Sequence, residues 1–184
     1  MSDDNHKDEL TERLQILSFV LDDESFGAQI GCIQEVLEYR KVTSVPRTPE
    51  FMLGVINLRG QVVPVVDLRQ VFDMEVIEPT IDSCIIIVKI PIEGEETSLG
   101  ILADRVKEVV ELNTGEIKPP PRIGNRLDSH FIQGMVQHED ELIILLHLTK
   151  VFSSEQLQKV LDPSADVDDS DEKETSDSAD MPLD

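Results

Sequence analysis

The stretch that decides the fold is FMLGVINLRGQVVPVVDLRQVF, residues 51–72. Apolar, largely β-branched runs stand on both sides of Arg59-Gly60, and this is the pattern of a β-hairpin with a short glycine-containing turn. Pro64 lies within the second run. Because proline has no N–H to donate to a strand ladder, it predicts an edge position or a bulge there. Asp67 begins DLRQ, an acid followed three residues later by a glutamine, which predicts a capping box and a short helix.

The same arrangement occurs a second time at residues 131–152, FIQGMVQHEDELIILLHLTKVF. An offset of 80 positions aligns the two stretches, so that Gly54 corresponds to Gly134. The region before each stretch repeats at an offset of 73, which pairs Gly27 with Gly100. The difference of about seven residues falls in the proline-rich loop of the second copy. Two copies in a chain of this length predict two similar small domains rather than a solenoid, which needs at least about three repeats.

Each copy contains about five short strands broken by glycine, proline and acidic turns, which is typical of small barrels or a sandwich. The repeat favours two such units side by side, and a groove between domains is a common binding place. The predicted divisions are a disordered N-terminus (1–13), a first β-barrel subdomain (14–82), a second β-barrel subdomain (83–153), a C-terminal helix (154–161) and a disordered acidic tail (162–184).

The charge of the chain excludes some classes of partner. The 184 residues carry a formal net charge of -22, and residues 162–184 alone contain ten acids and one lysine. Nucleic-acid affinity comes from Lys and Arg on the phosphate backbone, so this composition argues against a nucleic-acid partner. It also disfavours an anionic membrane surface. No apolar run has the length of a membrane span and the N-terminus has no hydrophobic signal region, so we expect a cytoplasmic protein without direct membrane insertion.

No catalytic or metal-binding constellation is evident in the sequence. The four histidines do not pair with Cys or carboxylates at a recognised metal spacing, the glycines are scattered singly, and no serine has a nucleophile-elbow context. Cys32 and Cys84 lie in apolar runs and are expected to be small buried hydrophobes. The sequence therefore predicts a binding protein without enzymatic activity or cofactor.

Two charged residues are not required by the hydrophobic pattern. Arg59 is a cation at the predicted hairpin tip, and it is either a solvated partner of a nearby acid or a contact for an acidic partner protein. The second copy has Glu139 at this position, so the two hairpins are not interchangeable. Glu35 is either a simple outward-facing residue or the rim of an apolar patch. Its neighbours Ile33 and Val36, like their copies in the second repeat, are expected in the core on general burial preferences.

Several runs of the chain together resemble the signature of the CheW family, and the combination of NLRG with VPVVDLR at this spacing is its most specific part. The similarity extends from about residue 14 to 161. The runs that carry it are IQEV (33–36), Pro46, TPEF (48–51), GVINLRG (54–60), VPVVDLR (63–69), GIL (100–102), DRV (104–106) and FIQG (131–134).

The resemblance implies both a fold and a function. CheW-type proteins are mainly β, with two similar five-stranded SH3-like β-barrels packed side by side and short helices. They are non-catalytic cytoplasmic adaptors of bacterial chemotaxis, associated with receptor arrays at the inner membrane. They couple the histidine kinase CheA, through a related regulatory domain of that kinase, to the cytoplasmic tips of chemoreceptors.

The resemblance also implies where the partners bind. The receptor tip is a helical hairpin that docks in the groove between the barrels. Its contacts are expected at Ile33, Glu35, Val36, Gly54, Arg59 and Val106. Contacts with the kinase are expected on the second barrel, at Ile85, Gly100 and Gly134. The glycines are expected to act through the shape of the barrels.

Two other functions are compatible with the sequence. A CheW-like scaffold of a non-chemotaxis array, such as one for surface motility, would have the same signature. A generic SH3-like peptide-binding module is less favoured, because recognition of proline-rich peptides uses aromatic-lined grooves. This chain has one Tyr and no Trp.

Overall fold

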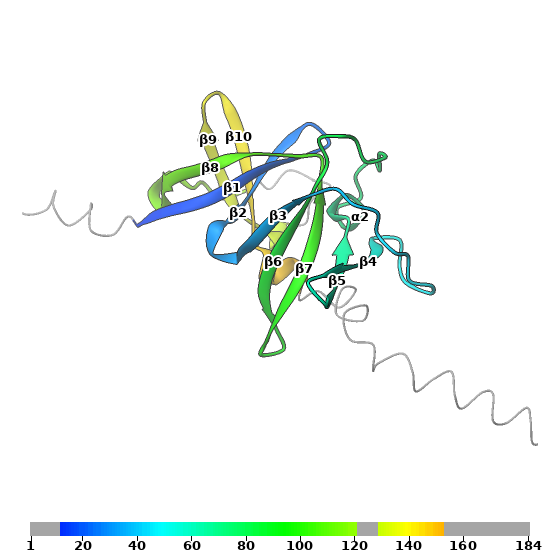
Figure 1. Ribbon diagram of the computed structural model, residues 1–184. Coiled ribbons are helices and arrows are strands. Elements are labelled where there is room, and N and C mark those ends of the chain that lie inside the picture. The colour runs from blue at the N-terminus through cyan, green and yellow to red at the C-terminus, as the bar shows by residue number, and fades with distance from the viewer. Residues whose placement is uncertain (1–11, 121–128, 153–184) are drawn as a thin grey trace, which may run out of the picture.

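The structure, a computed structural model, describes residues 12–120 and 129–152 and is built mainly from strands (Figure 1). The strands are β1 (Arg13–Leu21), β2 (Glu24–Gln29), β3 (Ile33–Glu38), β4 (Met52–Leu58), β5 (Gln61–Val66), β6 (Cys84–Ile92), β7 (Glu95–Ala103), β8 (Arg105–Asn113), β9 (Ile132–His138) and β10 (Glu141–Leu146). The helices are the 3-10 turns η1 (Ile30–Cys32), η2 (Thr114–Glu116) and η3 (Ser129–Phe131), and the short α2 (Leu68–Val71) and α3 (Leu148–Phe152). None of these helices has the length and apolar character to cross a membrane.

The strands form two five-stranded sheets, and each sheet mixes strands from both copies of the repeat. One sheet has the order β3-β6-β7-β5-β4, and we call it the inner unit; the other has the order β8-β1-β2-β10-β9, and we call it the outer unit. The predicted boundary between 82 and 83 is therefore wrong, because the first two strands of each copy are exchanged. The predictions for residues 1–11, for the helix at 154–161 and for the tail at 162–184 concern residues outside the described ranges.

In each sheet, strands from the two copies of the repeat are joined by one parallel strand pairing. β2 lies parallel to β10, and β5 lies parallel to β7. The hydrophobic pattern of a strand specifies which of its faces is buried, but it does not specify which of two equivalent strands lies beside it. The choice of partner is thus a property of the whole chain. In Figure 1 the two units lie side by side, with β3 leading from one into the other.

Both predicted hairpins are present. Arg59 and Gly60 at the tip of the β4–β5 hairpin have φ angles of 52° and 85°, and Glu139 and Asp140 of the β9–β10 hairpin have 45° and 66°. Two successive left-handed residues are typical of the tight turns that match the twist of antiparallel strands. Pro64 precedes the first residue of β5 that pairs with β7, so the proline stands just outside that ladder.

The two edges of each sheet are also joined. Thr43, which follows β3, exchanges two backbone hydrogen bonds of 2.9 and 2.8 Å with Val55 in β4. Lys118, which follows β8, exchanges two of 2.8 Å with Met135 in β9. These matching bridges leave fewer backbone groups free along the edges, where strands otherwise attract other chains.

The buried apolar side chains form three clusters, one between the units and one within each unit. The largest, which we call the central core, lies between the units and takes side chains from both sheets and both α-helices. Each unit also has a smaller cluster of its own. In β6, Ile85 and Ile87 face the cluster of the inner unit, whereas Ile86 and Val88 face the central core. Burial of both faces explains why this strand is a continuous apolar run.

One buried charge joins the units. Arg69 in α2 is 2% exposed, and its guanidinium forms an ion pair with Asp104, between β7 and β8. The other carboxylate oxygen of Asp104 accepts a hydrogen bond of 2.8 Å from the backbone N–H of Asp22 in the β1–β2 turn. Asp67 caps α2 by accepting from the N–H of Arg69 at 3.0 Å. Burial raises the pKa of Asp67, and the hydrogen bond and charge of Arg69 partly offset this increase.

Candidate partner-binding surface

The first candidate feature is an ion pair on the inner unit, which we call the paired corner. Arg59 at the tip of the β4–β5 hairpin contacts Glu35 of β3, with 2.7 Å between Nη2 and Oε2. The Arg59 side chain is 72% exposed, whereas that of Glu35 is 21% exposed. The sequence left open whether Arg59 pairs with a nearby acid. The structure shows that it does, and that the guanidinium remains accessible to a partner.

A β-bulge in β3 decides which of its side chains lie together. The pairing with β6 shifts by one residue between Ile33, opposite Val88, and Glu35, opposite Ile87. Directly opposed residues of an antiparallel pair project on the same face. Ile33 and Val36 therefore both lie on the face of the central core, while Glu35 lies on the opposite face, toward the hairpin tip.

The strand β8 contains a matching β-bulge. Its pairing with β1 shifts between Val106, opposite Phe19, and Glu108, opposite Ser18. Val106 and Val109 therefore lie on the face of the central core, as their counterparts in β3 do. Glu108 lies on the other face. The two bulges place matching apolar pairs on both units where these meet.

We call these four residues, Ile33, Val36, Val106 and Val109, the junction strip. Ile33 and Val106 are half-buried against the central core, whereas Val36 and Val109 are 41% and 52% exposed. The expectation that all four belong to the core is therefore wrong for Val36 and Val109, which lie at the surface. Exposed apolar side chains can take part in contacts with other proteins, so the junction strip is a candidate binding surface.

The outer unit carries a counterpart of the paired corner, which we call the acidic corner: Glu108, His138 and Glu139. His138 Nε2 lies 3.3 Å from Glu108 Oε1, and one ligand atom from each of the three side chains lies within 4.8 Å of the others. Lys107 nearby is paired with Glu141, and this hydrogen bond lowers the pKa of Glu141. The two units thus present corners of the same construction but different charge.

The residues expected to contact the kinase lie in the interior. Ile85 is fully buried, and Gly100 and Gly134 are buried as well. Ile85 and Gly100 belong to the inner unit and Gly134 to the outer unit, so they do not share one barrel. A Cβ at Gly100 would lie 3.0 Å from Ile85 Cγ2, and one at Gly134 would lie 2.8 Å from the Lys118 carbonyl oxygen. These glycines therefore shape the sheets.

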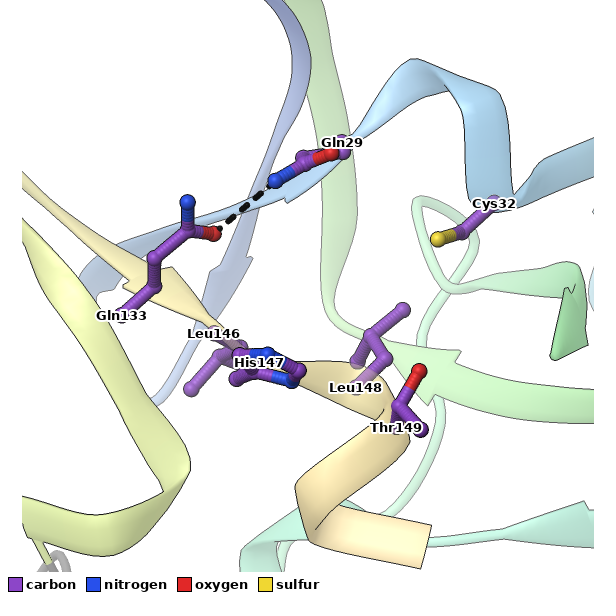
Figure 2. Close-up of a pocket in the computed structure, with 7 residues that line it drawn as sticks. All are labelled: Gln29, Cys32, Gln133, Leu146, His147, Leu148 and Thr149. Atoms are coloured by element: carbon purple, nitrogen blue, oxygen red, sulfur yellow. Dashed lines mark hydrogen bonds between the residues drawn. The ribbon is translucent and has the colours of Figure 1, made fainter. Parts of the chain in front are cut away.

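A cavity of about 190 Å³ lies among η1, β9 and the start of α3 (Figure 2). Gln29 donates a hydrogen bond of 3.2 Å to Gln133 across one side of it. Cys32 faces it from η1 and His147 from the start of α3. Burial raises the pKa of the Cys32 thiol, which keeps the sulfur protonated at neutral pH and makes it a poor nucleophile.

Comparison with known proteins identifies the fold and its family. A family model described as the CheW-like domain matches residues 15–156, most of the chain. The chain belongs to the CheW-like family. Chemotaxis protein CheW from Rhizobium meliloti is 31% identical over 142 residues, which cover 77% of this chain and 89% of the relative. The protein of the same name from Klebsiella aerogenes is 32% identical over 146 residues, which cover 79% and 86%. Protein FrzA from Myxococcus xanthus is 29% identical over 148 residues, which cover 79% and 89%.

A solved structure of the CheW-like family supports the same conclusion. The scaffolding protein TtCheW from Thermoanaerobacter tengcongensis superposes with a TM-score of 0.70 and 34% sequence identity, over 79% of this chain and 91% of that chain. The predicted resemblance to CheW and the predicted mainly β fold, with two five-stranded units side by side, are confirmed.

Sequence reasoning missed two features of this CheW-like surface. The bulges at Gln34 and Lys107 were not predicted, although an apolar spacing of three within a strand (Ile33 to Val36) is a signal for one. The ion pair of Arg69 with Asp104 was also missed, because both residues were used only as parts of the family signature.

Proposed function

We propose that this CheW-like protein is a non-catalytic cytoplasmic adaptor that couples the histidine kinase CheA to the tips of chemoreceptors. The observation that carries the proposal is the junction strip. Its two exposed valines lie on matching strands of the two units, and its half-buried residues continue toward the central core. A helix of a receptor tip would lay its apolar ridge along such a strip, which is a general mode of helix recognition.

The paired corner would orient that helix. Glu35 holds Arg59 through a 2.7 Å contact, while most of the Arg59 side chain is exposed to solvent. A fixed, accessible guanidinium recognises carboxylates in a defined geometry. Complementary charges of this kind contribute more to orientation and association rate than to affinity. Gly54 is buried, so we propose that it supports the receptor site through the position of its strand.

We propose that binding of the CheA regulatory domain depends on Ile85, Gly100 and Gly134 through the shape of the units. All three are buried, so a substitution there would act by moving a strand. The adaptor would transmit a signal by holding kinase and receptor in fixed relative positions, with no chemistry of its own.

A second candidate is a scaffold of a signalling array that does not serve chemotaxis. Protein FrzA from Myxococcus xanthus, whose name does not mention chemotaxis, matches as much of the chain as the relatives named CheW. Both functions would use the same strip. The generic SH3-like peptide module is opposed by the structure of the strip, which holds only aliphatic side chains, whereas such modules use aromatic grooves.

Replacing Val36 by aspartate should weaken binding of a receptor-tip fragment at least tenfold. The substitution would place a carboxylate within an apolar contact, where it cannot keep its water. The matched control is Val62→Asp, a change of a still more exposed valine (64%) on the β4–β5 hairpin. Both variants should unfold at nearly the wild-type temperature, because exposed positions contribute little to stability. Titration calorimetry with the receptor fragment, and capture of the CheA regulatory domain by the same variants, provide the measurements.

Loss of receptor binding by Val36→Asp alone, with CheA still captured, supports the adaptor function and the position of the receptor site. Equal binding by wild type and Val36→Asp would exclude the junction strip as the receptor site. Capture of neither partner by the wild-type protein would contradict the coupling function, and the proteins then captured from cell extract would identify the array that it serves.

Arg59→Glu should also weaken receptor binding about tenfold, because it places a second negative charge beside Glu35 and removes the accessible cation. Lys89→Glu is the control, since Lys89 forms an ion pair with Glu96 on the β6–β7 hairpin of the same unit. The double variant Glu35→Arg/Arg59→Glu restores the pair with reversed polarity. If it binds the receptor as wild type does, Arg59 acts only within the pair and makes no contact with the receptor.

A further inference from the structure

We propose that the acidic corner of the outer unit, Glu108, His138 and Glu139, binds a divalent transition-metal ion of the zinc class. The three residues come from β8 and from the tip of the β9–β10 hairpin. Glu108 and Glu139 occupy the positions of Glu35 and Arg59 in the inner unit, and His138 occupies the position of Leu58. The site is independent of the proposed adaptor function and is tested separately from it.

The separation of the ligand atoms fits such an ion. Bonds of about 2.0–2.2 Å from zinc to imidazole nitrogen and carboxylate oxygen place two tetrahedral ligand atoms about 3.3–3.6 Å apart. His138 Nε2 and Glu108 Oε1 are 3.3 Å apart, and the carboxylate of Glu139 lies within 4.8 Å of both. The two glutamates are exposed, so their side chains can close the remaining distance without disturbing the sheet.

The negative charge of the acidic corner also favours binding of a cation. In the inner unit the guanidinium of Arg59 neutralises Glu35. In the outer unit Glu139 replaces that arginine, and none of the described ion pairs brings a Lys or Arg to Glu108 or Glu139. The ammonium of Lys107 is engaged by Glu141. Two carboxylates and an imidazole thus converge where the equivalent site of the first copy has a positive charge.

The imidazole ligand of His138 indicates which class of metal ion the site would prefer. Exposed carboxylates alone are common and would hold Mg²⁺ or Ca²⁺ weakly, whereas an imidazole ligand favours Zn²⁺, Ni²⁺, Co²⁺ or Cu²⁺. Three protein ligands leave a fourth tetrahedral position for water or for a carboxylate of a partner protein. A bound ion would give the outer unit a positive centre at the position where the inner unit has Arg59.

The test is titration of the full-length, untagged, metal-free protein with zinc chloride, followed by calorimetry. His138→Ala and His138→Gln should each weaken binding at least tenfold. Glu139→Arg, which installs the residue type of the inner unit, should weaken it similarly. His147→Ala is the matched control, because His147 lies at the start of α3 and belongs to a different site, and it should change the affinity less than twofold. Circular dichroism of each variant verifies the fold.

Cobalt(II) mapped by NMR gives a second readout that does not depend on affinity. The amide signals of residues 108 and 138–141 should broaden first. The proposal is overturned if wild type and the His138 variants bind zinc equally, if broadening centres on other acids or on His6, or if no zinc binds at 1 mM.

Discussion

Arg69→Met should lower the free energy of unfolding by about 3 kcal/mol, the low end of the range for removing one partner of a buried ion pair. The Arg69 side chain is 2% exposed; its guanidinium pairs with Asp104 and donates from Nη1 to the carbonyl oxygen of Ile77 at 3.4 Å, and its Nε has no hydrogen-bond partner. Without it, Asp104 keeps its hydrogen bond from Asp22 but loses its counter-charge. The side chain of Asp104 is 21% exposed, so water relieves part of the cost.

Urea unfolding of matched variants measures this effect. Arg13→Met is the control, because Arg13 and Glu111 form an ion pair of 3.1 Å whose side chains are 80% and 50% exposed. Exposed pairs of this kind contribute between about 0 and 1 kcal/mol. The double variant Arg69→Met/Asp104→Leu should regain part of the loss, since an apolar pair leaves no buried charge unpaired. A loss below about 1 kcal/mol for Arg69→Met would show that the pair does not stabilise the junction.

The location of Arg69 explains why we expect one cooperative transition. Through Asp104 it links α2 of the inner unit to the β1–β2 turn of the outer unit. The central core is likewise built from both sheets. The units share their most buried contacts, so neither has a complete core without the other.

The sequence predicts the local elements of this fold well, because their signals lie within a few residues. Arg59-Gly60 between two β-branched runs predicts a hairpin, and the pair adopts the left-handed angles that such a turn requires. Asp67 predicts the start of α2, and its carboxylate caps that helix. The repeat predicts two similar units, and this also holds.

The assignment of strands to sheets could not be predicted in the same way. β2 and β7 are equivalent in the two copies, and each pairs with the last strand of the other copy. Alternation of apolar residues is satisfied by either choice of partner. Packing of the whole chain around a shared central core decides between them, and no short window of sequence contains that information.

The sequence predicted which residues belong to the candidate site, but it did not predict on which face of the strand each of them lies. Ile33, Glu35 and Val36 were named together, yet the bulge after Ile33 sends Glu35 to the opposite face from the other two. Strict alternation would have grouped Ile33 with Glu35. A bulge inserts one residue and reverses the alternation beyond it, so the sequence identified an apolar patch and a charge without separating them.

Gly54→Ala is the other substitution expected to have a large effect, a loss of more than about 3 kcal/mol in the free energy of unfolding. Gly54 has a φ of +147°, a conformation that L residues rarely adopt. An added Cβ would lie 2.6 Å from the carbonyl carbon of Thr43 and closer still to its oxygen. That carbonyl accepts from the N–H of Val55 at 2.8 Å, so it cannot move away without breaking the bridge that joins β4 to the segment after β3.

The Gly60→Ala variant separates the backbone strain of a positive φ from the clash of an added Cβ with a neighbouring carbonyl. Gly60 also has a positive φ, of 85°, but nothing lies within 4 Å of an added Cβ. It should therefore lose only about 1 kcal/mol, the strain of a left-handed residue. Urea unfolding measures the free energy of unfolding of both variants. Titration with the receptor fragment compares their affinity for the receptor. Because Gly54 is buried, its variant should lose stability and receptor binding together. A Gly54→Ala protein that unfolds like Gly60→Ala yet fails to bind would show instead that the receptor contacts the backbone of β4 directly.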